Sequence, residues 1–373
     1  MTAFEYGKKA ADAIMEQYAP HELCPQRFFA YYNGVFLAGV EKLYKKTGDK
    51  KYYDYIKDWV DFHINEDGTL NETGVWARLT SLDFRKSGTL LFDIYSITGD
   101  KKYWNIIEYL VESLKYFPKN KYGGFWHATY HEEQMWLDGL YMAGPICTMY
   151  AQKTGKSEFL EMAIRQIEIM WDHTIDEKSG LMVHGWDDNR KDKKAQWADP
   201  DTGLSQEVWG RAQGWYVVAI CDMLEYIPSD HPKRPKIEMI LNTMLKRIIK
   251  YQDQVDGRWF EVVDKGHLPG NWHENSCSCL FVNAIAQAIQ KGCLEKEYAE
   301  SARKGYEGII ASLQYDENGR LILPDICVGT AIESGTYQYY IDRPRCSNDL
   351  HGSGTFILMC YQMDQLEAYL NKQ

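Results

Sequence analysis

The sequence predicts an all-α protein: an (α/α)6 barrel, in which six helix pairs close into a toroid with short strands in the loops. Three observations lead to this fold. Amphipathic segments alternate with segments that are apolar on every side, turn signals recur at a nearly regular spacing, and no Pro-, Ser- or Gly-rich linker divides the 373 residues. We therefore expect residues 1–373 to form one domain.

The first set of segments has the helical period. Apolar residues recur at i, i+3, i+4 and i+7 while Lys and Glu fill the opposite face, which is typical of a helix with one side in solvent. We expect these segments to form the outer helices: Tyr53–Ile64, Leu90–Thr98, Tyr103–Tyr116, Phe159–Trp171, Ile237–Tyr251 and Tyr298–Leu313.

A second set of segments carries apolar or small residues on all sides. A helix of this kind is buried all round. We expect these segments to line the inside of the ring: Gly34–Leu43, Gly139–Tyr150, Val208–Leu224, Cys277–Ala288 and Gly354–Met363.

Turn signals of the acid–Gly type precede several short apolar or aromatic runs, as in a hairpin. Their glycines, Gly68, Gly123, Gly180, Gly257 and Gly319, lie about 63 residues apart on average. At this spacing the chain holds about six units, each with an outer helix, a strand-like loop and an inner helix. An open helical solenoid is the alternative, but the long aromatic-rich loops favour a closed ring with a pocket at one end.

Composition excludes several classes of protein. A net charge of −11 without a Lys/Arg block argues against nucleic acid and membrane surfaces as partners. The chain has no apolar stretch of about 18 residues and no N-terminal secretory pattern, and its nine cysteines are scattered, so we expect reduced thiols and a cytoplasmic protein. The excess of Trp and Tyr over Phe suits surfaces that stack on sugars.

A polar residue stands near the start of each expected inner helix: Asn33, Asp83, Asp138, Glu207, Glu274 and Asp349. If these helices point the same way, the six side chains surround one mouth of the barrel. Helix capping is the competing explanation for each of them. Asp138 fits capping least, because it lies within an apolar aromatic stretch where desolvation would raise the pKa of its carboxyl toward that of a general acid.

Glu207, Arg211 and Trp215 are spaced at i, i+4 and i+8 on one expected inner helix. A Glu207–Arg211 salt bridge is the ordinary explanation. However, the helix is apolar all round, and a buried guanidinium beside an indole suits a carboxylated sugar. We therefore expect a ligand-binding role for Arg211.

The sequence contains no motif that supports a metal site or a nucleotide site. His131 begins a pattern similar to a zinc protease, but Met135 replaces the second His. Cys277 and Cys279 point to different faces of a helix and cannot chelate together. No glycine-rich phosphate loop and no serine-hydrolase motif is present, so we expect no metal and no cofactor.

Several motifs together resemble glycoside hydrolase family 105, the unsaturated rhamnogalacturonyl hydrolases, over nearly the whole chain. They are WLDGLYM at 136–142, GGFWH at 123–127, WGRAQGW at 209–215, DICVGT at 325–330 and NDLHG at 348–352. The resemblance implies the (α/α)6 fold and removal of a 4,5-unsaturated galacturonyl unit from the non-reducing end of pectin fragments. It also implies that the C4=C5 double bond is hydrated, so that neither a covalent nucleophile nor a metal is needed.

The resemblance also assigns roles to residues. Asp138 matches the acid/base that protonates C4, and Asp83 matches a second aspartate that touches the unsaturated ring. The other matches are substrate-binding positions, of which Thr330 lies in the loop closing the subsite beyond the cleaved bond: Tyr31, His127, Trp136, His184, Arg211, Trp215 and Thr330.

Other functions remain open from the residues alone. An inverting glycosidase would use Asp83 and Asp138 about 6.5–9.5 Å apart. A sugar epimerase would rely on His184 and His351, and a non-catalytic sugar-binding toroid would use the acidic residues only as caps. In each case the expected ligand is a small oligosaccharide, bound by a monomer or weak homo-oligomer.

Overall fold

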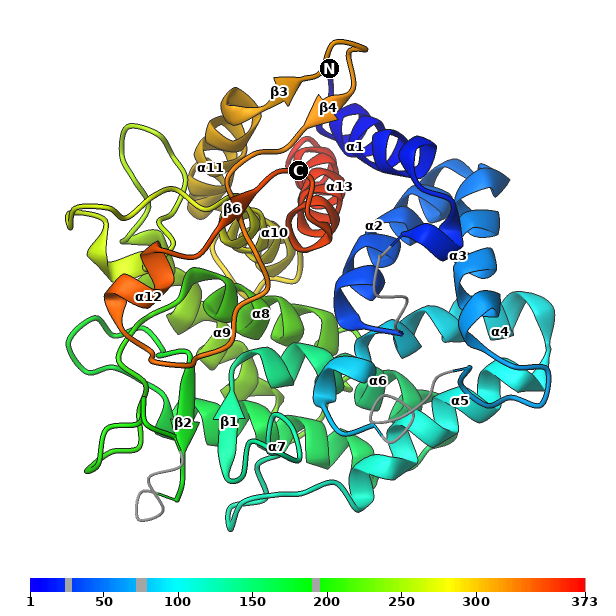
Figure 1. Ribbon diagram of the computed structural model, residues 1–373, viewed down its shortest axis with the longest axis horizontal. Coiled ribbons are helices and arrows are strands. Elements are labelled where there is room, and N and C mark those ends of the chain that lie inside the picture. Colours follow the sequence, from blue (N-terminus) through cyan, green and yellow to red (C-terminus); the bar gives the residue numbers. More distant parts are fainter. Residues whose placement is uncertain (24–28, 72–78, 190–194, 373) are drawn as a thin grey trace.

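The computed structural model describes residues 1–23, 29–71, 79–189 and 195–372, and over these ranges the chain forms thirteen α-helices and six short strands. Helices form two concentric layers around a central axis (Figure 1). The (α/α)6 barrel predicted from the sequence is confirmed, including the short strands in the loops.

The inner layer is a closed ring. Its members are α2 (Tyr31–Thr47), α4 (Leu90–Thr98), α6 (Asp138–Thr154), α8 (Gly210–Met223), α10 (Asn275–Gln290) and α13 (Leu350–Leu370). Helix α2 contacts α13, α13 contacts α10, α10 contacts α8, and α8 contacts α6. The 3-10 helix η4 (Lys86–Thr89), which leads into α4, contacts both α6 and α2 and closes the ring.

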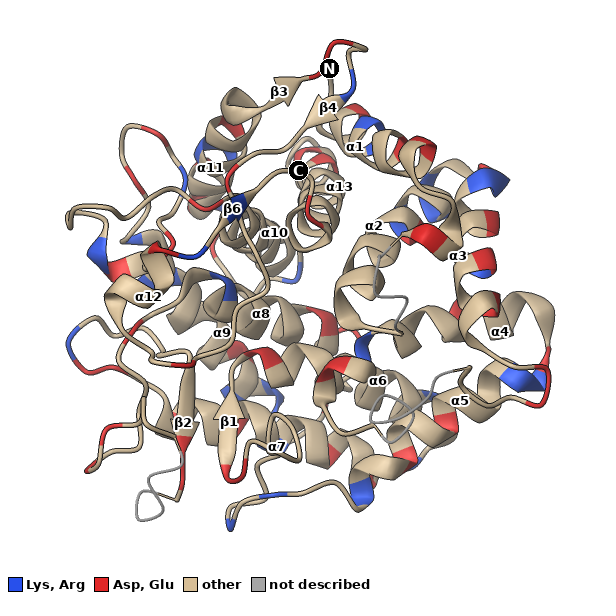
Figure 2. Ribbon diagram, viewed as in Figure 1, with Lys and Arg blue, Asp and Glu red and all other residues tan. Residues whose placement is uncertain are grey.

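An outer helix packs against each inner one. The outer helices are α1 (Ala3–Gln17), α3 (Lys50–His63), α5 (Lys101–Glu112), α7 (Ser157–His173), α9 (Arg234–Ile249) and α11 (Ala299–Ser312). Each follows its inner partner in the chain, except that α1, at the N-terminus, packs on α13, at the C-terminus. Charged residues of both signs recur along the ribbons of α1, α3 and α5 (Figure 2).

The sequence assigned one helix to the wrong layer and overlooked another. Leu90–Thr98 was expected outside, but it continues η4 in the inner ring, and its amphipathic pattern arises because its last turn emerges into solvent. The sixth outer helix is α1. Its signals are a capping box between Thr2 and Glu5 and buried residues on one face, among them Ala10 and Ile14.

The predicted turns are confirmed. All five glycines have positive φ, between 73° and 87°. Each turn lies in a loop that leads from an outer helix to the next inner one, and backbone bridges such as Ile64–Leu70, Lys119–Phe125 and Ile175–Met182 flank three of them. The long loops therefore gather at the end of the barrel where the inner helices begin.

Three two-stranded ribbons and a short helix complete the loops. Strand β1 (Gln134–Trp136) pairs with β2 (Gly185–Asp187), β3 (Gln314–Tyr315) with β4 (Leu321–Ile322), and β5 (Ile326–Cys327) with β6 (Arg345–Cys346), all antiparallel. Helix α12 spans Tyr337–Ile341. Over the described ranges, no helix combines the length and apolarity needed to cross a bilayer.

Glycines allow the inner helices to approach closely. A Cβ at Gly354 of α13 would lie 2.6 Å from the backbone nitrogen of Phe36 on α2, and one at Gly34 would lie 2.5 Å from Ser87 Oγ on η4. Backbone atoms cannot yield as a flexible side chain can, so the ring closes at this spacing only with glycine at position 354.

We expect Gly354→Ala to lower the free energy of unfolding by about 3 kcal/mol, the upper range for overpacking a core, because α13 and α2 must separate. Urea unfolding measures this change. Ser96→Ala, at an exposed position on α4, is the control and should change stability by less than about 0.5 kcal/mol. Equal stabilities of the two variants would contradict the close contact.

Candidate active site

The inner helices begin at the mouth of the barrel and bring residues distant in sequence together. Asp138 is the first residue of α6, Arg211 the second of α8, Tyr31 the first of α2 and His351 the second of α13. Asp83 lies in the 3-10 helix η3 (Leu82–Phe84), which contacts α6. Helix N-termini favour negative charge, so this end of the barrel suits an anionic ligand.

Asp138 faces His184. His184 Nε2 lies 3.3 Å from Asp138 Oδ2, and both side chains are buried. The backbone holds them together, since the Leu137 N–H donates to the His184 carbonyl at 3.0 Å beside the β1–β2 ribbon. The other nitrogen of the His184 imidazole, Nδ1, lies 2.7 Å from the Tyr340 hydroxyl. Tyr340 was not expected to take part; it fixes the orientation of the imidazole.

Asp138 is ionised in the free protein. Burial raises the pKa of its carboxyl, but His184 and His127 outweigh that effect and hold the pKa below its usual value. The raised pKa expected from the sequence is therefore wrong, because two histidines distant in sequence take the place of the missing Lys or Arg. Burial lowers the pKa of His184 despite the attraction of Asp138, which favours the neutral imidazole.

Asp83 forms a second pair, with His127. Their Oδ1 and Nε2 atoms are 3.5 Å apart. Burial lowers the pKa of His127, but the Asp83 carboxylate more than compensates, and the pKa lies above its usual value. The imidazole also stacks on Trp136, with ring centres 4.3 Å apart and planes 13° apart. The site thus holds one histidine that favours the charged form and one that favours the neutral form.

Arg211 is almost completely buried. Its Nη2 donates to the carbonyls of Cys327 and Val328, and the guanidinium lies over the ring of Trp209. The carboxylate of Glu274 is 4.0 Å away. Nε and Nη1 have no hydrogen-bond partner among the described residues. The contacts of Nη2 therefore hold the guanidinium in place, while the N–H donors of Nε and Nη1 remain available for an anion.

Glu207 is not the partner of Arg211. It precedes α8, which begins at Gly210, and pairs with Lys265. The expected common helix face of Glu207, Arg211 and Trp215 is thus wrong, because the chain before Gly210 is extended. Of the six polar residues near the starts of the inner helices, Glu274 and Asp349 are N-caps, and Asp138 is not.

Tyr31 belongs to a chain of hydrogen bonds that the sequence did not predict. Its hydroxyl lies 2.7 Å from His351 Nε2, and His351 Nδ1 contacts the Asp349 carboxylate. Burial raises the pKa of Asp349, but His351 outweighs it and brings the pKa to about 2. The NDLHG motif contains both residues, but only closure of the ring shows that they orient Tyr31.

Trp215 forms the floor of the site. It is fully buried, and Tyr31 meets it edge-on with ring centres 6.4 Å apart. On its other side Trp215 stacks on Tyr141, with centres 4.6 Å apart. The indole Nε1 has no hydrogen-bond partner among the described residues.

The rim combines aromatic side chains with the loop of Thr330. Trp136 and Trp197 pack with Ile332, and they line a cavity of about 240 Å³ together with His131 and Glu333. Thr330 donates to the Val328 carbonyl at 2.8 Å and accepts from Arg343 Nε at 3.1 Å, so its hydroxyl stabilises the loop that also holds Arg211. Trp197 was not predicted.

Buried polar atoms without partners concentrate here. Buried polar groups are normally hydrogen-bonded, so such a concentration marks a ligand site. Among the described residues, the site contributes six atoms that form no hydrogen bond, although Asp138 Oδ2 and His184 Nε2 face each other as an ion pair: His127 Nδ1, Asp138 Oδ2, His184 Nε2, Arg211 Nε and Nη1, and Trp215 Nε1. In the same part of the chain, no group of three or more His, Cys, Asp or Glu residues is arranged to hold a metal ion.

Comparisons with known proteins agree with this site. The model of Glycosyl Hydrolase Family 88 matches residues 6–367. A glycoside hydrolase of family 105 from C. acetobutylicum superposes with a TM-score of 0.91 at 32% identity, covering 96% of this chain and 99% of that one. The chain belongs to the glycoside hydrolases of families 88 and 105. The family predicted from the motifs is thus confirmed, and the protein is an enzyme of this type.

Other relatives of this family 88/105 hydrolase are similar over shorter ranges. Unsaturated rhamnogalacturonyl hydrolase YesR of Bacillus subtilis is 28% identical over 314 residues, which is 82% of this chain and 81% of YesR. Protein Atu3128 of Agrobacterium fabrum is 33% identical over 239 residues, which is 61% of this chain and all of that protein.

Glu261 gives the site a testable pH dependence. Its buried carboxyl accepts from Trp209 Nε1 at 2.9 Å, and burial together with the Glu274 carboxylate raises its pKa to about 8, against the opposing effect of Arg211. The folded state therefore binds this proton more tightly than the unfolded state does, so stability falls as the pH rises from about 5 toward 8.

We expect Glu261→Gln to remove this loss. The difference in free energy of unfolding between the variant and wild type should shift in favour of the variant by on the order of 3 kcal/mol from pH 5 to pH 7.5. Urea unfolding at both pH values measures this shift. Glu300→Gln, at an exposed position on α11, serves as the control and should follow wild type. Parallel curves for wild type and Glu261→Gln would contradict a protonated Glu261.

Proposed function

We propose that this hydrolase releases the 4,5-unsaturated galacturonyl residue from the non-reducing end of lyase-generated rhamnogalacturonan oligosaccharides. The observation that carries the proposal is the placement of Asp138 and Arg211 around one buried mouth, each with polar atoms that form no hydrogen bond with the described residues. Asp138 supplies a carboxyl group for proton transfer, and Arg211 supplies N–H donors for a carboxylate. A 4,5-unsaturated uronate needs both.

The proposed reaction is hydration of the C4=C5 bond. This alkene is an enol ether conjugated with a carboxylate, and a proton from Asp138 to C4 leaves an oxocarbenium-like cation at C5 and the ring oxygen. Water adds at C5 and returns its proton to the Asp138 carboxylate. The resulting hemiketal opens and expels the remaining sugar, so atoms and charge balance without a covalent enzyme intermediate.

Substrate binding explains how an ionised Asp138 acquires its proton. A uronate carboxylate in the site adds a negative charge close to Asp138, and like charge raises the pKa of a carboxyl group. In the free enzyme His184 and His127 keep the pKa low. The proton therefore enters with the substrate, and the carboxyl is ionised again when the product leaves.

Arg211 is placed to receive the substrate carboxylate. Nε and Nη1 keep N–H donors without a partner on the two edges of the guanidinium that flank Nη2, and a carboxylate oxygen can accept a charge-assisted hydrogen bond from either of them. The contacts of Nη2 with the Cys327 and Val328 carbonyls orient these donors before binding. Trp215 offers an indole N–H to the same ligand.

The Asp83–His127 pair is suited to hold the water that adds at C5. The carboxylate accepts and the imidazolium donates, and Asp83 keeps 28% of its side chain exposed, so water can reach it. Trp136, stacked on His127, then faces the sugar beyond the cleaved bond together with Trp197. We assign Tyr31, held by His351, to the ring in the first subsite.

The rest of the proposal concerns the protein as a whole. We propose one domain over residues 1–373, no metal or cofactor, and a monomer or weak homo-oligomer that acts on small oligosaccharides and not on nucleic acid. The eight described cysteines are all free, which supports a reducing compartment such as the cytoplasm.

The test is loss of the ultraviolet absorbance of the alkene when the enzyme meets a lyase-generated unsaturated rhamnogalacturonan disaccharide. Asp138→Asn should lower the rate by about 10³-fold or more, because the amide cannot donate a proton, and should still bind the disaccharide. Asp58→Asn, at an exposed position on α3, is the control and should keep full activity.

Other outcomes would replace the proposal. Persistent absorbance with folded enzyme would exclude the reaction. Cleavage of a saturated disaccharide with inversion at the anomeric carbon would instead indicate an inverting glycosidase, and saturable binding without product would indicate a sugar-binding protein. A series of unsaturated disaccharides with different reducing-end sugars identifies the group preferred beside the uronate.

A further inference from the structure

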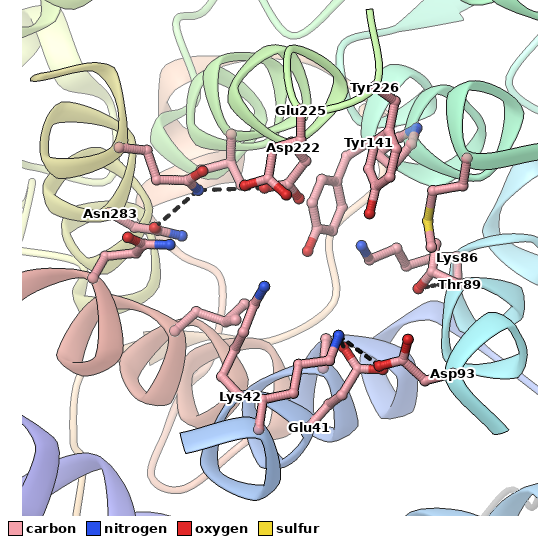
Figure 3. A pocket seen from close by; sticks show the side chains of 18 residues that line it. Glu41, Lys42, Lys86, Thr89, Asp93, Tyr141, Asp222, Glu225, Tyr226 and Asn283 are labelled. Atoms are coloured by element: carbon pink, nitrogen blue, oxygen red, sulfur yellow. Dashed lines mark hydrogen bonds and ion pairs between the residues drawn. The ribbon is translucent and has the colours of Figure 1, made fainter. Parts of the chain in front are cut away.

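A second cavity lies on the barrel axis, beyond the floor of the candidate active site. It measures about 100 Å³ and is lined by residues from every element of the inner ring, from α2 to α13 (Figure 3). We call it the axial pocket. Tyr141 and Trp215, stacked 4.6 Å apart, separate it from the mouth. The axial pocket is therefore distinct from the site that holds Asp138.

Most charged groups of the axial pocket are paired. Lys45 pairs with Glu41 at 3.2 Å and with Asp93 at 2.5 Å. Glu225 pairs with Lys291 at 3.0 Å. These contacts lie at the rim, where the side chains of Lys45 and Glu225 are 44% and 45% exposed. Because Glu41 and Asp93 share Lys45, the rim keeps one net negative charge.

Two ammonium groups and one carboxylate of the axial pocket form no ion pair with the described residues. Lys86 and Lys42 make no hydrogen bond or ion pair with any described residue; Lys86 Nζ lies 4.0 Å from the centre of the Tyr141 ring, and Lys42 Nζ lies 5.8 Å from that of Tyr361. Asp222 accepts only from Gln287, at 3.3 Å, within the described chain. The unpaired groups thus carry one net positive charge, and Figure 3 shows all three turned toward the cavity.

Of these three groups, the Lys86 amine gives the strongest indication of a ligand. The residue is only 4% exposed, and burial lowers the pKa of its amine. An ammonium taken out of water without an anion costs several kcal/mol, which the cation–π contact with Tyr141 offsets only in part. Asp222 and Glu41 favour the charged amine through space, but neither makes an ion pair with it, so the N–H donors of this buried lysine lack an acceptor among the described residues.

We propose that the axial pocket binds a small monocarboxylate, with its oxygens between Lys86 and Lys42. One carboxylate would neutralise the single positive charge that Lys86, Lys42 and Asp222 carry together inside the cavity. The Tyr141 hydroxyl and the Asn283 amide, whose oxygen accepts from Gln287 at 3.2 Å, face the same space and supply neutral hydrogen bonds. The volume admits a few heavy atoms and is well below the roughly 300 Å³ at which drug-sized ligands begin to fit.

Acetate is the probe, and acetamide is its neutral isostere. Saturation-transfer NMR of the methyl group of each, titrated into the full-length enzyme, should give a saturable signal for acetate and none for acetamide. Lys86→Met preserves side-chain length without charge and should remove that saturable component, weakening binding by about tenfold or more. Lys50→Met, 78% exposed on α3, is the matched control and should retain it.

Stability provides an independent measurement. Without acetate, Lys86→Met should melt at or above the temperature of wild type, because the substitution removes a buried unpaired charge. Lys42→Met, nearer the rim, should fold normally and weaken acetate binding several-fold. An unchanged acetate titration in Lys86→Met, an equal response to acetamide, or a Lys86→Met protein that melts well below wild type or fails to fold would each overturn the proposal.

Discussion

Packing of the last inner helix against the first is the contact on which the site depends. Helices α13 and α2 meet at backbone distance through Gly354, and their first turns then bring His351 to Tyr31 across 320 residues of sequence. Once this contact forms, all the inner helices share one direction and one mouth. The polar residues of the site can lie far apart in the sequence, since closure of the ring brings them together. Closure also determines at which end of the axis the long loops gather.

Electrostatics differ between the two ends of that axis. At the mouth, aspartates pair with histidines, and two nitrogens of a guanidinium remain free among helix N-termini. Beyond the floor, Lys86 and Lys42 face the axial pocket. A net charge of −11 therefore says little about the ligand, because the outer helices carry much of the charge and the axis has cationic groups of its own. Tyr31, Trp215 and Tyr141 form the aromatic layer between the two regions.

Sequence patterns predicted the features that depend on neighbouring residues and failed for the features that depend on closure of the ring. Hydrophobic texture distinguished inner from outer helices, and the turn glycines gave the number of units, because both depend on neighbouring residues. The texture failed at Leu90–Thr98, where the ring uses a 3-10 turn and a short helix that partly emerges. Spacing also failed for Glu207 and Arg211, since it assumed a helix that begins three residues later. Tyr340 and Trp197 carry no local signal, and His351 stands in the NDLHG motif, but only the closed ring shows that it holds Tyr31.

In the proposed reaction, the low pKa of Asp138 bears on specificity as well as on rate. If the carboxyl were protonated in the free enzyme, any enol ether that fitted the site would receive the proton. An ionised carboxyl held by His184 and His127 requires a nearby negative charge before it becomes an acid at neutral pH. A neutral sugar of the same shape would leave Asp138 ionised even if it bound well. Discrimination would then appear in kcat as well as in KM, and the selection for uronates would come from proton affinity in addition to the contact with Arg211.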